Sequence, residues 1–169
     1  MSVFELWLPI LAAGIAVHIA STIAWVALPH HKPEWPRLDS EKDPTGWLRE
    51  RGVRPGQYFI DAQADDACGG TLVLWRQRPN MGANIGLTVS MFLWISLLIG
   101  YLASLALEPG AAPMEVFRFT FTAAFLVHVC GGVVHVIWFR RKLLMDTLDG
   151  LVYALITGGV YTLLWPAAG

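Results

Sequence analysis

Residues 116–139 read VFRFTFTAAFLVHVCGGVVHVIWF. After Arg118, this stretch contains no Lys, Arg, Asp or Glu. About 20 apolar residues in an α-helix are enough to cross the hydrocarbon core of a bilayer. A strand of a membrane β-barrel would instead alternate polar and apolar residues, which this stretch does not do. The stretch therefore predicts a transmembrane helix.

Three further runs, residues 4–28, 85–107 and 148–165, are also apolar and lack Lys, Asp and Glu in their middle. The whole chain of 169 residues is 55% hydrophobic and only 15% charged, which is unusual for a soluble domain. Backbone amides in lipid must bond internally, which favours helices. We therefore expect an all-α membrane protein with one transmembrane helix in residues 1–28 and three in residues 85–169.

The first run differs from a secretory signal peptide. No Lys or Arg precedes it, and it exceeds the about 7–15 apolar residues that are usual in such peptides. We expect this run to remain in the membrane as a span.

Residues 29–84 predict a small domain outside the membrane. The segments GQYFIDAQ (56–63) and GTLVLWRQR (70–78) are typical of short strands on either side of the turn-rich ADDACGG (64–70). Before them, DPTGWLRERG (43–52) predicts a short helix that Asp43 or Thr45 caps and Gly52 ends. We expect a β-hairpin here, and an irregular loop is the alternative.

The basic residues predict the orientation of the chain. They lie mainly in two connections, as Lys32, Arg37, Lys42, Arg49, Arg51, Arg54, Arg76 and Arg78 in the first and Arg140, Arg141 and Lys142 in the second. Lys and Arg favour the cytoplasmic side. The chain is thus expected in the bacterial inner membrane, with residues 29–84 cytoplasmic and both termini periplasmic. Eight acidic residues balance the basic ones in residues 29–84, so no nucleic-acid partner is expected.

Small and hydroxylated residues share helix faces and indicate where the helices pack on one another. Three such faces are predicted: Gly14, His18, Ser21, Thr22 and Trp25 in the first span, Ser90, Trp94, Tyr101 and Ser104 in the second, and Tyr153, Thr157 and Tyr161 in the fourth.

Three histidines lie within the predicted spans. His128 and His135 are seven residues apart, so in a regular helix they share one face, with two glycines between them. His18 is expected at a depth similar to that of His128. Neutral imidazole is an axial ligand for haem iron or chlorophyll magnesium, so haem b or (bacterio)chlorophyll is one interpretation. The alternatives are hydrogen bonds to facing helices, or a proton or metal pathway.

His30 and His31 follow the first span, with Asp61, Asp65, Asp66 and Cys68 in the same connection. Adjacent side chains of an extended chain point in opposite directions, so we expect no metal site from this pair. The chain also contains none of the common nucleophile, phosphate-binding or zinc-protease motifs, and we expect no enzyme activity.

A resemblance supports the four-span architecture. Several segments in and around the spans, in their order along the chain, resemble a family of small four-span bacterial inner-membrane proteins to which no activity is assigned. The segments that carry the resemblance are WVALPHHKPEWPRL, RPGQYFI, RPNMGANIGL, VFRFTFTAAFL, VIWF and DGLVYALITGGVYTLLWP. The histidine pattern is not part of this resemblance, and no catalytic or cofactor residue follows from it.

Together these observations favour an accessory membrane subunit. The chain is small, lacks a charged mid-membrane site and is rich in aromatic residues suited to contact surfaces. We expect the lipid bilayer and other integral membrane subunits as its partners, within an energy-transducing complex, photosynthetic or respiratory. The alternative is a b-type haem or chlorin-binding carrier that uses His18, His128 and His135.

Overall fold

The structure is a computed structural model, and it describes residues 1–34, 39–61, 69–139 and 143–168. The chain divides into two compact units. One, the helical unit, consists of residues 1–31 and 82–169; the other consists of residues 32–81. The basic residues Arg37 and Arg140 to Lys142 and the predicted turn, including Cys68, lie outside the described residues.

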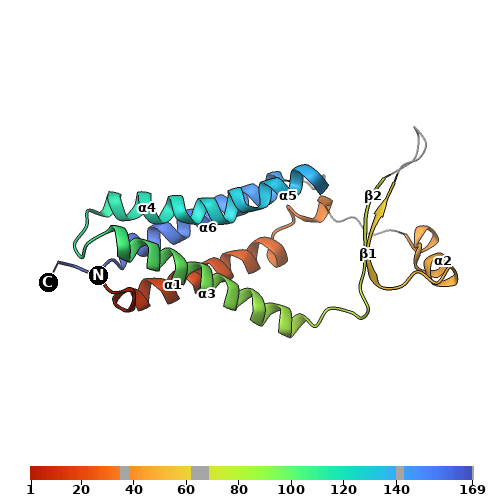
Figure 1. Cartoon of the computed structure of the whole chain (residues 1–169), viewed down its shortest axis with the longest axis horizontal. Helices are drawn as coiled ribbons and strands as arrows, with labels where there is room; N and C mark the ends of the chain where they lie inside the picture. Colours follow the sequence, from red (N-terminus) through yellow and green to blue (C-terminus); the bar gives the residue numbers. More distant parts are fainter. Residues whose placement is uncertain (35–38, 62–68, 140–142, 169) are drawn as a thin grey trace. The chain divides into compact units, whose positions relative to one another are not determined.

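The helical unit contains four long helical stretches (Figure 1). The first joins a 3-10 turn (Val3–Leu6), α1 (Trp7–Thr22) and a π-helical turn (Ile23–Ala27). The second is α3 (Met81–Ala106), and the last is α6 (Leu144–Leu163). Between them, α4 (Pro113–Phe125), a second π-helical turn (Leu126–Cys130) and α5 (Gly131–Phe139) follow one another without a break.

Three of the described helices are long and apolar enough to cross a membrane: Val3–Ala27, Met81–Ala106 and Pro113–Trp138. They agree with the first three predicted runs, although the second and third begin about one turn earlier than predicted. The fourth run corresponds to α6, which is not among the helices that are apolar enough to cross a membrane. The chain is thus compatible with a multi-pass membrane protein, with three spans supported by length and composition.

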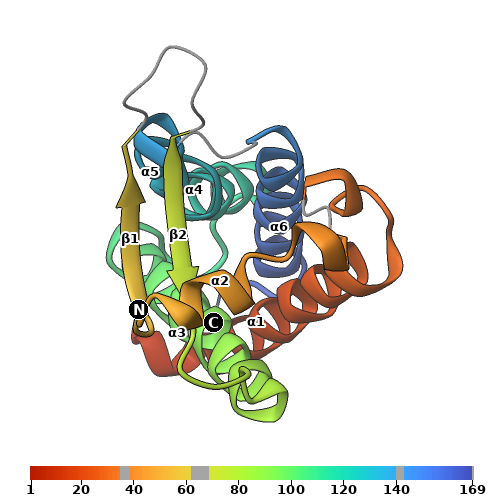
Figure 2. The ribbon, with the colours of Figure 1, turned by 90° about the vertical axis from the view of Figure 1, so that its right-hand side faces the viewer.

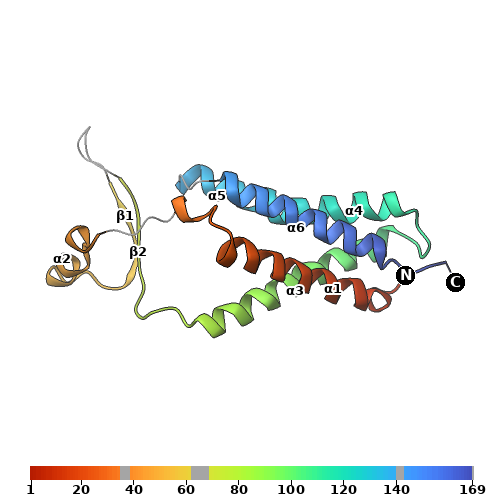
Figure 3. The same ribbon diagram turned by 180° about the vertical axis from the view of Figure 1, so that it is seen from behind.

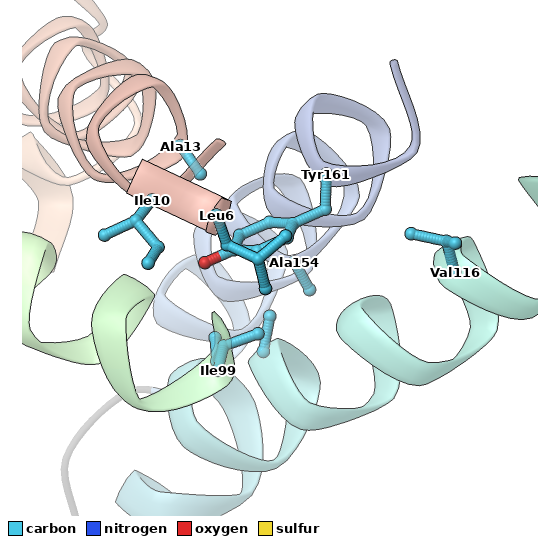
Figure 4. Close-up of a cluster of buried hydrophobic side chains, with 8 residues drawn as sticks. Leu6, Ile10, Ala13, Ile99, Val116, Ala154 and Tyr161 are labelled. Carbon is cyan, nitrogen blue, oxygen red and sulfur yellow. The ribbon is translucent and has the colours of Figure 1, made fainter. Parts of the chain in front are cut away.

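Helix α6 packs on α4 and on α1 (Figure 3). Its buried side is small or hydroxylated and includes the predicted Tyr153, Thr157 and Tyr161, so that prediction is confirmed. Figure 4 shows Tyr161 pointing into the cluster of buried apolar side chains that joins the helices. Its hydroxyl donates a hydrogen bond of 2.6 Å to the Ser96 carbonyl of α3.

Helix α3 packs through a different face from the predicted one. Of the predicted residues, Ser104 is buried, but Trp94 and Tyr101 are 57% and 50% exposed. The buried residues of α3 are instead Ser96, Ile99, Gly100, Ala103 and Ser104. A Cβ on Gly100 would lie 2.9 Å from both Ile10 and the Tyr161 hydroxyl, so this small residue sets the close approach of α3 to its neighbours.

The first half of α3 diverges from α1 (Figures 1 and 3). Here Ile85, Leu87 and Met91 are 49%, 70% and 58% exposed. Only the second half of α3 contributes fully buried side chains to the helical unit.

The predicted hairpin is confirmed in the second unit. Strands β1 (Gly56–Ile60) and β2 (Gly70–Leu74) pair antiparallel, with Tyr58 opposite Leu72 (Figure 2). The predicted short helix forms as α2 (Thr45–Glu50), but its N-cap residue is Pro44 and carries no side-chain cap, so the predicted capping by Asp43 or Thr45 is wrong. The Asp43 carboxylate accepts hydrogen bonds from the backbone N–H and the hydroxyl of Thr45, and Gly52 adopts φ +68° after the helix.

Candidate functional site

Two histidines and one carboxylate meet within the helical unit. His30 Nε2 lies 3.1 Å from Asp149 Oδ1, and His31 Nε2 lies 3.0 Å from Asp149 Oδ2. The side chains of His31, Asp149 and His30 are 5%, 13% and 22% exposed. More than 110 residues separate the pair from Asp149, so the tertiary fold, rather than a local turn, creates this cluster.

The backbone between the first span and residue 32 explains why adjacent histidines converge. Residues 29–31 form a bend and a turn rather than an extended strand. The two imidazoles consequently lie on the same side, with ring centroids 4.3 Å apart. The prediction that their side chains point apart is therefore wrong, because it assumed an extended chain.

The π-helical turn of the first span holds one of these rings. Trp25 belongs to this turn, and its indole stacks on the His31 imidazole at 3.9 Å with an interplanar angle of 9°. The stack covers one face of the ring and fixes its plane.

The second π-helical turn contacts the same part of α6. A Cβ on Gly150, the residue after Asp149, would lie only 2.6 Å from the His128 carbonyl oxygen. One turn further along α6, Tyr153 is 9% exposed, and its buried hydroxyl lies close to the side chains of Ser21 and Asp149. The carboxylate thus lies where α6 approaches the second π-helical turn, and the first turn reaches the cluster through the Trp25–His31 stack.

The three histidines of the predicted tetrapyrrole site are placed differently from one another. His18 and His128 are partly buried and both face the Phe92 ring, at centroid distances of 6.4 and 6.0 Å. His135 is exposed. The expectation that His128 and His135 share one face assumed a regular α-helix, whereas His128 lies inside the π-helical turn, whose i→i+5 bonding shifts the phase of the helix.

Phe92 fills the space between His18 and His128. The small pocket beside His128, which Gly14 and Phe92 also line, is too narrow for a water molecule. One observation still favours a ligand, since His18 Nδ1 is buried with no hydrogen-bond partner in the described structure. Tetrapyrrole binding stays a prediction, and it would require Phe92 to turn away.

No local sequence pattern identifies Asp149 as the partner of His30 and His31. Asp61, Asp65, Asp66 and Cys68 were the further metal ligands considered beside His30 and His31. Of these, Asp65, Asp66 and Cys68 lie outside the described residues, and Asp61 belongs to the other unit. The available signal was a carboxylate at the start of an otherwise apolar run, since intramembrane acids are costly and usually have a partner.

Comparisons with models of protein families, with curated proteins and with solved structures gave no match. The function proposed below is therefore inferred from the positions and contacts of the residues alone.

Proposed function

We propose that the chain is a four-span accessory subunit of a larger complex in the bacterial inner membrane, with residues 29–84 in the cytoplasm. Support for a fourth span comes from how α6 distributes its residues. Its buried residues are all small or hydroxylated, whereas Leu148, Val152 and Leu155 are 46–47% exposed. A helix with its polar side covered by protein can cross a bilayer with a lower mean hydropathy than a solitary span.

The positions of the chain ends also support this number of spans. The N- and C-termini lie at the same end of the helical unit (Figure 1). There, the Gly110 N–H donates a hydrogen bond of 2.8 Å to the Pro166 carbonyl, which ties the connection after α3 to the segment after α6. An even number of crossings places both ends on one side of a bilayer.

Labelling of the two ends tests this arrangement. A single cysteine introduced after Met1 or before Gly169, in a chain whose Cys68 and Cys130 are replaced by serine, is expected to react with a membrane-impermeant maleimide in intact spheroplasts. A cysteine at position 46, on α2, is the matched control and should react only after lysis. Labelling of one end alone would show that α6 does not cross, and protection of both ends would reverse the proposed orientation.

The first half of α3 is the surface on which we expect another subunit to dock. Gly82, Gly86 and Ser90 recur every four residues and are exposed, and the space around a Cβ on Gly86 is open. Small residues at this spacing let a second transmembrane helix approach closely, which lipid chains do not require. The expected partner is therefore a transmembrane helix of another subunit, sought first in energy-transducing complexes.

Replacing Gly86 with leucine is expected to abolish co-purification of a stoichiometric partner in mild detergent. The leucine side chain would occupy the surface on which the partner helix packs against α3. Since a Cβ on Gly86 would meet nothing within 4 Å, the thermal midpoint of the isolated chain should not fall by more than about 2 °C. Gly132→Leu, at an equally open glycine on α5, is the control and should retain the partner. A wild-type chain that elutes alone would contradict an accessory role.

A further inference from the structure

We propose that His30, His31 and Asp149 bind one divalent transition-metal ion. Donor atoms from all three side chains lie within 4.8 Å of one another. Around an ion with ligand distances of about 2.0–2.2 Å, neighbouring donors are about 3.3–3.6 Å apart in a tetrahedral site and about 2.8–3.1 Å apart in an octahedral one. The two contacts between imidazole nitrogen and carboxylate oxygen, at 3.1 and 3.0 Å, match the octahedral spacing and are slightly shorter than the tetrahedral one. A small inward shift of the carboxylate would place an ion between the three donors.

The surroundings of the cluster resemble a built site more than a surface ion pair. Two of the three side chains are at least 87% buried, and the Trp25 stack holds the His31 ring in one plane. Both π-helical turns of the helical unit contact this region, through Trp25 and through the carbonyl of His128 against Gly150. Such turns are frequent at functional sites, where they displace a side chain or carbonyl from its regular position.

The donor set selects the class of metal. Two imidazoles and one carboxylate favour Zn²⁺ or Fe²⁺, whereas Mg²⁺ and Ca²⁺ prefer oxygen donors throughout. Three protein ligands leave at least one coordination position for water or a small exogenous ligand, as in catalytic rather than structural zinc sites. The Tyr153 hydroxyl, buried one turn beyond Asp149 and close to the side chains of Asp149 and Ser21, is a polar group beside this position.

Metal binding to the full-length chain in detergent tests the proposal. After removal of metal with a chelator, Zn²⁺, Fe²⁺ under anaerobic conditions and Co²⁺ as a spectroscopic probe are titrated separately. We expect one ion per chain for at least one of them, and a Co²⁺ absorption spectrum that shows nitrogen ligation. Asp149→Asn, which keeps the shape of the side chain, should weaken binding at least about 100-fold, and His31→Ala should do the same.

His135→Ala is the matched control, because this exposed histidine lies outside the cluster, and it should bind the ion as the wild type does. If His31→Ala does not fold, His30→Ala and Asp149→Asn decide. A wild-type chain that binds less than about 0.1 ion per chain would overturn the proposal. Equal affinities of the wild type and Asp149→Asn for the ion would also overturn it. Either result would leave the cluster as a hydrogen-bonded link between the first span and α6.

Discussion

Replacing Tyr161 with alanine is expected to destabilise the helical unit by about 3 kcal/mol or more. The side chain is fully buried in the cluster that joins α1, α3, α4 and α6 (Figure 4), so its loss leaves a cavity between these helices. The substitution also removes the hydrogen bond to the Ser96 carbonyl. The loss is measured as the change in unfolding free energy during titration of the purified chain from mild detergent into dodecyl sulfate.

Two further variants separate the causes of this loss. Tyr161→Phe removes only the hydroxyl and should cost about 1 kcal/mol. Tyr101→Ala, the same change as Tyr161→Ala at a half-exposed position of α3, should alter the unfolding free energy by no more than about 0.5 kcal/mol. Equal losses at positions 161 and 101 would contradict the placement of Tyr161 in the core.

Gly150→Ala is expected to destabilise the helical unit by about 1–3 kcal/mol. The new methyl group would lie 2.6 Å from the oxygen and 3.0 Å from the carbon of the His128 carbonyl. These are backbone atoms, so no side-chain rotation relieves the overlap, and α6 must move away from the π-helical turn. The shift in the thermal midpoint, followed by tryptophan fluorescence in detergent, measures the effect.

Gly159→Ala, on the same helix, provides the control for Gly150→Ala. A Cβ at Gly159 meets nothing within 4 Å, so alanine should be neutral or, through its higher helix propensity, stabilising by up to about 1 kcal/mol. The opposite ranking of the two variants would show that α6 does not approach the turn at Leu126–Cys130 as described.

Hydrophobic run length predicted the first three helices because a membrane span depends on composition over about 20 residues, and neighbours alter it little. The fourth helix shows the limit of that signal. Its buried residues, including Tyr153 and Thr157, lower its mean hydropathy because they serve contacts with other helices. The packing face of α3 was predicted wrongly because Trp94 and Tyr101 carry polar atoms on large side chains, which do not fit where helices lie close.

The candidate site was less predictable than the fold. Each histidine was visible in the sequence, but the partner of His30 and His31 lies in α6, at a distance along the chain that no local pattern spans. The predicted alignment of His128 with His135 relied on regular α-helical periodicity, which does not hold through residues 126–130. A π-helical turn has no clear signature in sequence, since it depends on contacts such as that of Gly150.

The π-helical turn at Leu126–Cys130 also bears on how this chain tolerates changes in length. The Gly131 N–H reaches back five residues to the Leu126 carbonyl, one more than in an α-helix, so the turn holds one surplus residue. A one-residue deletion within it can be absorbed by a return to ordinary winding, at the cost of rotating α5 about its axis relative to α4. The same deletion within α4 would offset its buried residues Val116, Thr120 and Ala124 from α6, so the two deletions have very different consequences for the bundle.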